Sequence, residues 1–159
     1  MKRNSGSKMK ISTKGRYALE IVTDLAVHSD REHPESLKAV SLRRGLSEKY
    51  LERIVRELKT AGILNSSRGA KGGYWIEKSP ESLTVKDTLR AVEGEMAPVE
   101  CLTTVKECGI DCSKCPTRET WGVMWEIILQ TMEDVTISDL VKRAMENAGS
   151  IKTEYGRMS

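Results

Sequence analysis

The stretch Gly45–Gly62, GLSEKYLERIVRELKTAG, decides the fold of this chain. Its apolar residues recur every three or four positions, so they share one face of a helix. Ser47 is suited to cap the start of that helix, and Gly62 is suited to end it. The apolar face holds Leu51, Ile54, Val55 and Leu58, and the opposite face holds Lys49, Glu52, Arg53, Arg56 and Lys59. The stretch therefore predicts an amphipathic helix with a mostly cationic outer face.

The residues before this helix complete a helix-turn-helix pattern. An apolar stripe over Thr13–His28 predicts a first helix, and Ser36–Arg44 predicts a short second helix that ends at Gly45. Two short helices joined by a tight glycine turn, the second capped by serine, are typical of a helix-turn-helix. Such a second helix lies in the major groove, where guanidinium groups bind guanine edges or phosphates. The alternative is a plain surface helix on a small bundle.

A hairpin follows the helix. Ile63–Asn65 and Tyr74–Ile76 predict two short strands, and Ser66–Gly73 predicts a glycine-rich basic turn between them. Glycines allow the backbone to approach phosphates closely, and Arg68 or Lys71 can enter the minor groove. A phosphate-binding P-loop is excluded because these glycines lead into a strand rather than a helix.

Together the two motifs predict a winged helix-turn-helix, mainly α with a small β-hairpin wing, that binds double-stranded DNA. The residues predicted to bind DNA are Ser47, Lys49, Tyr50, Glu52, Arg53, Arg56, Arg68, Lys71 and Gly72.

The charge distribution agrees with this interface. Residues 1–75 hold 16 Lys and Arg against 8 Asp and Glu, whereas residues 76–159 hold 10 against 15. A basic first half joined to an acidic second half indicates that only the first half meets a polyanion. Ordinary solvated surface charge is the alternative reading of charge alone.

Other classes of protein fit less well. No apolar run approaches the ~20 residues that cross a bilayer, and residues 1–8 are polar and basic, so we expect a cytoplasmic protein without a membrane partner. His28 and His33 are the only histidines, and no nucleophile elbow, zinc-protease motif or dinucleotide fingerprint is present. We therefore expect no enzyme.

Four cysteines, and no others, fall within fifteen residues: Cys101, Cys108, Cys112 and Cys115. Disulfides more naturally join distant parts of a fold, and a cytosolic protein keeps its thiols reduced. A thiolate cluster of this kind binds an iron–sulfur centre or zinc. Zinc fits less well because the paired Cys-x(2)-Cys knuckles usual for structural zinc are lacking.

A long helix is predicted after the cysteines. Apolar residues recur there at helical spacing, and a winged domain already has its own core, so this helix is predicted to mediate a homodimer. These residues are Trp121, Met124, Trp125, Ile128, Leu129 and Met132. Capping boxes at Thr84–Asp87 and Thr136–Asp139 predict the start of one helix before the cysteines and of a final short helix.

These predictions divide the chain into five parts. Residues 1–8 form a disordered extension, 9–95 the winged domain, 96–116 the cysteine loop, 117–146 the dimerisation helix and the short C-terminal helix, and 147–159 a disordered tail.

Three motifs carry a family resemblance: Lys14–Leu19 (KGRYAL), Leu46–Glu52 (LSEKYLE) and Arg68–Tyr74 (RGAKGGY). With the cysteine loop, they resemble the IscR-type branch of the Rrf family of winged-helix transcription regulators over roughly residues 9–143. The resemblance implies a homodimeric regulator with an iron–sulfur cluster. It also implies that Lys49, Glu52 and Arg53 read bases, and that Arg68 enters the minor groove.

The cluster ligands match this family only in part. Cys101, Cys108 and Cys115 stand at its three cysteine positions, but Arg118 stands where some members have a histidine ligand. Other members use an acidic ligand from the partner's first helix, and Arg16 occupies that position. An arginine guanidinium stays protonated and cannot ligate.

Both departures favour Cys112 as the fourth ligand, and solvent or a small thiol remains an alternative. The cysteine set suits a 2Fe–2S cluster, which we favour, or a 4Fe–4S cluster. Because Pro116 is suited to the first helical position, Cys115 is expected at a helix N-terminus that favours its thiolate. A zinc-stabilised or thiol-based redox repressor without a cluster is the alternative function.

Overall fold

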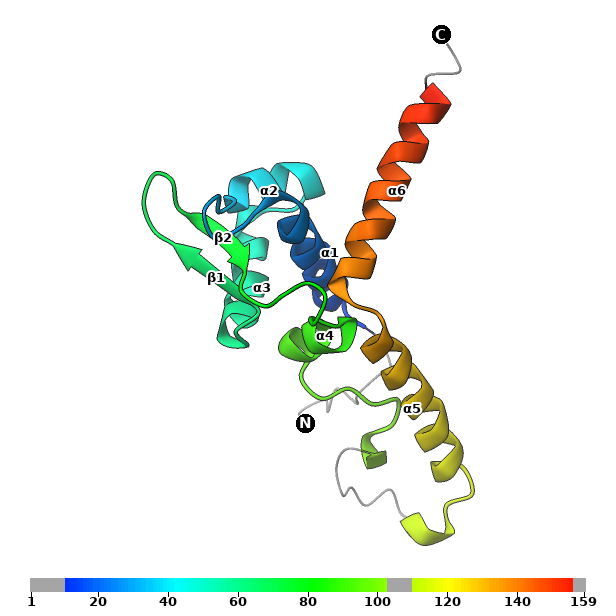
Figure 1. The fold of residues 1–159 in the computed structure, drawn as a ribbon. Coiled ribbons are helices and arrows are strands. Elements are labelled where there is room, and N and C mark those ends of the chain that lie inside the picture. The colour runs from blue at the N-terminus through cyan, green and yellow to red at the C-terminus, as the bar shows by residue number, and fades with distance from the viewer. Residues whose placement is uncertain (1–10, 103–109, 156–159) are drawn as a thin grey trace.

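A computed structural model describes residues 11–102 and 110–155 of the 159-residue chain (Figure 1). Its main helices and strands are α1 (Thr13–His28), α2 (Leu37–Arg44), α3 (Glu48–Thr60), β1 (Leu64–Ser67), β2 (Gly73–Ile76), α4 (Val85–Glu93), α5 (Arg118–Asp134) and α6 (Ile137–Tyr155). Two short 3-10 helices, η1 (Glu100–Leu102) and η2 (Cys112–Lys114), hold Cys101 and Cys112, and Cys115 directly follows η2. The prediction of a mainly α winged helix-turn-helix with a small hairpin is confirmed.

Local capping fixes the helix-turn-helix. The Ser47 hydroxyl accepts a hydrogen bond from the Tyr50 N–H at 3.3 Å, and the Ser36 hydroxyl accepts one from the Ala39 N–H at 3.2 Å. Gly45 ends α2 with φ 65°, a left-handed conformation that glycine adopts without strain. The Ser47 cap and the glycine turn are as predicted, and Ser36 caps α2 rather than forming its first residue.

The core lies between the first three helices, the start of the hairpin, α4 and the start of α6. The apolar face predicted for α3 is fully buried there, and removing side chains of this size from water stabilises a fold by about 1.5–3 kcal/mol each. The largest fully buried side chains are Ile21, Leu25, Leu51, Ile54, Leu58, Ile63, Leu83, Leu89 and Ile137.

The hairpin is anchored to the segment before α2. Strands β1 and β2 pair antiparallel, with Leu64 opposite Ile76 and Ser67 opposite Gly73. Glu35 and Tyr74 exchange two backbone hydrogen bonds of 2.8 and 2.9 Å. This extra bridge ties the wing to the helix-turn-helix.

The remaining helices connect the winged domain to the cysteines. The N–H groups of Val85 and Ile137 donate to the carbonyls of Val135 and Leu83, at 2.9 and 2.8 Å, so α4 and α6 start side by side. Both predicted capping boxes are present. Helix α4 packs on α1. Helix α5 runs from the cysteine loop back to the winged domain, and α6 then starts beside α1 and extends away from it (Figure 1).

Two predicted boundaries are wrong. Helix α5 begins at Arg118, with Thr117 at its N-cap, so Pro116 lies before the helix rather than at its first position. Helix α6 is not short, because it continues to Tyr155 where a disordered tail from residue 147 was expected. The predicted disordered extension, residues 1–8, lies outside the described residues, as do 156–159.

Candidate nucleic-acid interface and cysteine loop

The outer face of α3 presents the side chains that the sequence singled out. Lys49, Glu52, Arg53 and Arg56 are all exposed and lie opposite the buried apolar face. None of these four side chains packs in the core, so all four can contact a binding partner. Three cations with one carboxylate suit a DNA groove, where cations bind phosphates and guanine edges and a carboxylate binds a cytosine amine.

Two other predicted DNA-binding residues have structural partners. Ser47 caps α3, and Tyr50 is half-buried against Tyr17, with ring centroids 5.8 Å apart and planes at 85°. The guanidinium of Arg16 lies 4.8 Å from the centre of the Tyr17 ring. Edge-to-face packing of this kind fixes the first turn of α3 on the first turn of α1.

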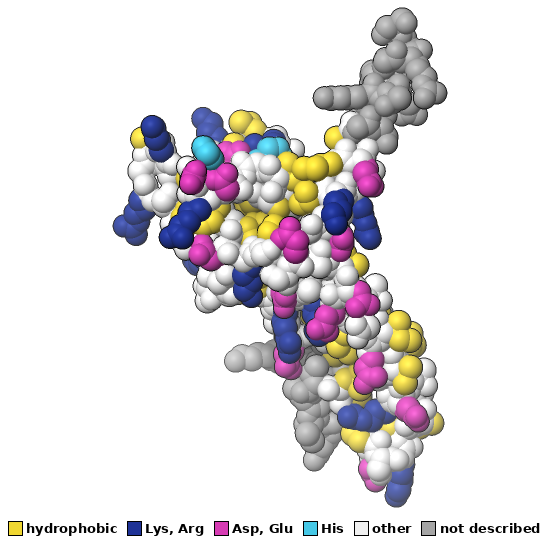
Figure 2. Space-filling view, in the orientation of Figure 1, with side chains coloured by type: hydrophobic (Ala, Val, Ile, Leu, Met, Phe, Trp, Pro, Cys, Tyr) yellow, Lys and Arg dark blue, Asp and Glu magenta, His cyan; other side chains and the backbone are white. Residues whose placement is uncertain are grey.

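The wing presents its own cations. Arg68 and Lys71 are exposed at the hairpin turn, on the side of the molecule where Lys and Arg side chains stand out in Figure 2. Lys59 joins α3 to this wing, because its ammonium group donates to the Ser66 hydroxyl at 2.5 Å and lies 5.8 Å from the Tyr74 ring centre. The cations of helix and wing are therefore held in one unit.

The geometry of this turn explains why position 72 is a glycine. A Cβ at Gly72 would stand 2.4 Å from the Ser67 carbonyl oxygen, so a larger residue would force the hairpin apart. The predicted DNA contact of Gly72 stays a prediction.

Sequence reasoning missed a buried ion-pair network beneath this interface. The Asp24 carboxylate in α1 is 1% exposed and accepts hydrogen bonds from two consecutive arginines at the end of α2. Arg43 donates through Nη2 at 2.8 Å and Nε at 3.1 Å, and Arg44 donates through Nε at 2.9 Å. Arg43 also pairs with Glu35 at 3.0 Å.

A signal for this network was present in the sequence. Asp24 interrupts the apolar stripe of α1 between Val22 and Leu25, and an acid on a buried face requires cationic partners. Those partners, Arg43 and Arg44, are twenty residues away, so only the folded chain identifies them.

The three described cysteines gather around Arg118. One guanidinium nitrogen of Arg118 donates to the Cys101 carbonyl at 2.5 Å and lies 3.7 Å from the Cys112 sulfur. Cys115 is three residues before Arg118, and its sulfur lies 3.6 Å from the Thr117 hydroxyl. The Arg118 side chain thus joins η1, η2 and the start of α5.

The Cys115 thiol has a lowered pKa. Its largest cause is the hydrogen bond from the Thr117 side chain, followed by one from the Thr117 backbone, and the charge of Arg118 adds to the effect. Hydrogen bonding to a thiolate favours that form, and the thiolate is the form that ligates metal. The largest cause is thus a side chain, while the backbone N–H groups of Thr117 and Arg118, at the start of α5, add the helix N-terminal contribution that we expected.

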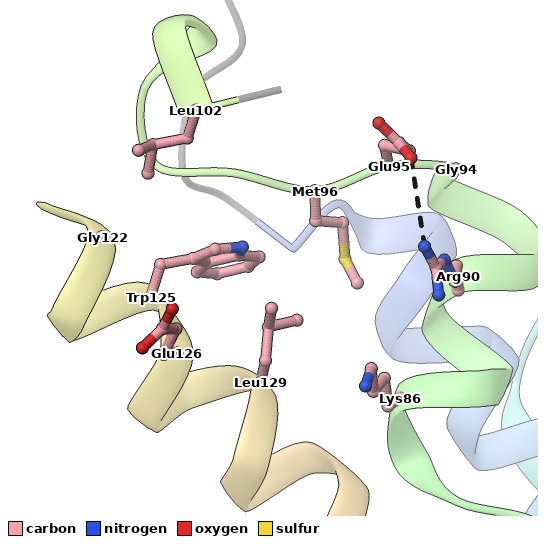
Figure 3. A pocket seen from close by; sticks show the side chains of 10 residues that line it. All are labelled: Lys86, Arg90, Gly94, Glu95, Met96, Leu102, Gly122, Trp125, Glu126 and Leu129. Carbon is pink, nitrogen blue, oxygen red and sulfur yellow. Dashed lines mark ion pairs between the residues drawn. The ribbon is translucent and has the colours of Figure 1, made fainter. Parts of the chain in front are cut away.

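Two neighbouring cavities border this loop. One of about 410 Å³ is lined by Cys112, Cys115 and Arg118. A second of about 560 Å³ lies between α4 and α5, where Trp125 and Leu129 face the α4 cations (Figure 3). Both cavities share Leu102, Gly122 and Glu126 as lining residues.

The thiol donor set fits an iron–sulfur cluster, because soft sulfur ligands suit such centres. Within residues 11–102 and 110–155, no three His, Cys, Asp or Glu side chains stand together as a metal site. The fourth cysteine, Cys108, lies outside the described residues.

Helix α5 has an exposed apolar face. Val123, Met124 and Ile127 are 52%, 44% and 62% exposed, and hydrophobic side chains run along this helix in Figure 2. Of the six residues predicted to mediate the dimer, only Met124 belongs to this face, because Trp125 and Leu129 line the cavity beside α4 and Met132 is buried. An exposed apolar face of this kind indicates an interaction site. Within the described parts of the chain, no helix is long and apolar enough to cross a membrane.

The sequence of this chain is similar to those of known transcriptional regulators and of related proteins. The chain is 39% identical over 132 residues to the transcriptional regulator CymR of Bacillus subtilis, covering 83% of this chain and 89% of that protein. It is 36% identical over 136 residues to protein rrf2 of Nitratidesulfovibrio vulgaris, covering 86% and 89%.

Solved structures agree with these relatives. The structure of B. subtilis CymR, described as the global cysteine regulator, superposes with a TM-score of 0.70 at 38% identity, covering 84% of this chain and 97% of that one. T. potens IscR superposes with a TM-score of 0.71 at 34% identity, covering 87% and 90%. Residues 11–143 match the Rrf2 family, described as iron-dependent transcriptional regulators. The chain therefore belongs to the Rrf2 family of transcriptional regulators.

Proposed function

We propose that this regulator is a homodimer that binds palindromic DNA under the control of an iron–sulfur cluster held by Cys101, Cys108, Cys112 and Cys115. The observation that carries the proposal is the position of three of these cysteines close to Arg118, at the start of α5. The Arg118 guanidinium contacts the Cys101 carbonyl and the Cys112 sulfur, and Cys115 lies three residues before it. The family description names iron, and the IscR relatives have the same fold. When bound, the cluster would supply sensitivity to iron, oxygen, nitric oxide or redox potential.

Helix α5 supplies the dimer in this proposal. Its exposed face, Val123, Met124 and Ile127, is apolar enough to pack against a second copy. A dimer places two α3 helices against half-sites about one helical turn apart, which a palindromic operator provides. Each DNA-binding residue of α3 and of the wing then contacts both half-sites of one operator, once from each protomer.

The DNA contacts divide into reading and positioning. On α3, Lys49, Glu52 and Arg53 are proposed to read bases, and Arg56 is proposed to bind phosphate. In the wing, Arg68 is proposed to enter the minor groove and Lys71 to bind phosphate.

The first prediction separates these two roles. Arg53→Ala should reduce discrimination at one base pair of each half-site by about 1–3 kcal/mol, because a lost bidentate contact relaxes specificity at that position. Lys71→Ala should weaken binding to all sequences and reduce the salt slope by about one counterion. Titration of operator and random DNA at several salt concentrations measures both. Equal losses on operator and random DNA for both variants would reduce α3 to an electrostatic surface.

The second prediction tests cluster control. Cluster-loaded and cluster-free protein should differ about 5- to 150-fold in affinity for one operator, the usual range of such coupling, while both remain dimers. Anaerobic titration at fixed salt measures affinity, and light scattering measures mass. If cluster-loaded and cluster-free protein bound every operator with equal affinity, the cluster would have only a structural role. If the dimer were lost on cluster removal, oligomerisation would be the switch.

A thiol-based regulator is the second candidate. It is favoured by the partners that the cysteines have in the protein alone: Arg118 beside the Cys112 sulfur, and Thr117 beside the Cys115 sulfur. CymR, a relative described as a cysteine regulator, also favours it. Anaerobically purified protein separates the two, because a cluster gives a brown protein with iron and sulfide, whereas a zinc-bound or thiol protein is colourless.

A further inference from the structure

The last residue of α4 is bound to the first turn of α1. One carboxylate oxygen of Glu93 accepts hydrogen bonds from the N–H groups of Ser12, at 3.0 Å, and Gly15, at 3.1 Å. The Ser12 hydroxyl donates to the same oxygen. These groups lie at the positive end of the α1 dipole, where a carboxylate is stabilised.

Gly15 makes this close approach possible. A Cβ at Gly15 would stand 2.4 Å from the same Glu93 oxygen, so a larger residue would displace the carboxylate. The Ser12 hydroxyl also accepts from the Gly15 N–H at 3.2 Å, which caps α1 from its own side. The contact is therefore built from both partners, and is not a chance meeting of flexible side chains.

The same turn of α1 reaches the recognition helix. The Lys14 ammonium pairs with the Glu57 carboxylate of α3 at 2.9 Å, and both side chains are about two-thirds to three-quarters buried. Tyr17, one turn further on, packs edge-on against Tyr50 of α3. A shift of the first turn of α1 therefore acts directly on α3.

The other end of the connection is the cysteine loop. Immediately after Glu93 the chain turns at Gly94, with φ 75°, and passes to Cys101, whose carbonyl accepts the hydrogen bond from Arg118. The path from the cysteines to α3 thus runs through Glu93, the first turn of α1, and Lys14.

We propose that Glu93 is a positioning residue that transmits the state of the cysteine loop to the recognition helix through the first turn of α1. This inference rests on the proposed cluster control. Glu93 touches neither DNA nor cluster in this scheme, and it acts by setting where α1 stands relative to α4.

The test compares Glu93→Gln with Glu95→Gln. Glu95 is a matched control because it is a nearby carboxylate, 70% exposed, whose partner Arg90 is 3.9 Å away. Glu93→Gln should shrink the ratio of cluster-loaded to cluster-free operator affinity by about 2- to 30-fold, the effect expected of a residue on a coupling route. Iron per chain should stay at the wild-type value, and Glu95→Gln should keep the wild-type ratio.

A second readout uses cluster-free protein alone. Amide hydrogen exchange in the first turn of α1 should accelerate in Glu93→Gln and not in Glu95→Gln, because the carboxylate charge that holds those N–H groups is lost. If Glu93→Gln does not fold, Lys14→Gln takes its place and should shrink the ratio as well. The role of Glu93 is overturned if the wild type has a ratio of cluster-loaded to cluster-free operator affinity that differs well from one and the folded variant has the same ratio. A wild-type ratio of one overturns the cluster control itself.

Discussion

Asp24→Asn is expected to lower the free energy of unfolding by about 2–4 kcal/mol, the largest stability effect of any single polar substitution that we predict. The carboxylate is 1% exposed and neutralises Arg43 and Arg44, and it raises the pKa of the Arg43 guanidinium. Asparagine keeps one acceptor oxygen but leaves two cations without their shared charge partner. The two arginine side chains are 31% and 32% exposed and can be partly hydrated in the variant. The expected loss in the free energy of unfolding is therefore at or below the loss for breaking a fully buried ion pair.

Asp30→Asn is the matched control for this substitution. Asp30 also contacts a nitrogen-bearing side chain, the imidazole of His33, but both side chains are exposed, at 64% and 79%. Exposed pairs contribute about 0–1 kcal/mol, so this variant should unfold close to wild type. Urea unfolding at fixed protein concentration measures both variants. Equal midpoints for the two would show that the Asp24 network contributes no more than a surface pair.

Asp24→Asn should also weaken operator binding at temperatures where the variant is folded. The network attaches the end of α2 to α1, directly before the turn at Gly45 that orients α3. A looser α2 lets α3 occupy several orientations, and only a fraction of them fits the groove. The apparent affinity falls by that fraction.

The parts of this fold that sequence alone predicts are those set by local rules. Periodicity placed the buried face of α3, and the caps at Ser47 and Thr84 placed two helix starts to the residue, while the start of α2 was placed one residue too early, at Ser36. The hairpin was predicted within one or two residues, because its strands and its glycine turn lie within fourteen residues of one another. In each case the deciding contacts are only a few residues apart.

Contacts between distant residues were beyond such rules. Glu93 meets the start of α1 across 78 to 81 positions, and nothing in its own neighbourhood marks it. Helix α6 was predicted too short because its end is polar and carries Gly149, so neither apolar periodicity nor a clear stop defines it. The start of α5 was placed too early because Pro116 suits a first helical position, yet the chain turns once more before Arg118.

The cysteines permit the sharpest prediction about the proposed site. Replacing Cys101, Cys108 or Cys115 by alanine should each abolish the cluster, because all three are ligands in the proposed site. Cys112→Ala should do the same if Cys112 is the fourth ligand. Ser113→Ala, next to Cys112, is the control and should keep wild-type iron and sulfide per chain. Iron analysis and visible absorption of anaerobic protein measure all five variants.

A second substitution, at Arg118, tests whether Cys112 is the ligand whose loss removes the cluster. Its guanidinium lies 3.7 Å from the Cys112 sulfur and stands where some family members have a histidine ligand. In the double variant Cys112→Ala with Arg118→His, an imidazole is available close to the lost thiolate, and iron binding should return with an altered absorption spectrum, because imidazole replaces thiolate on one iron. Full, spectrally unchanged iron in Cys112→Ala alone would instead assign the fourth ligand to solvent or to the other chain of the dimer.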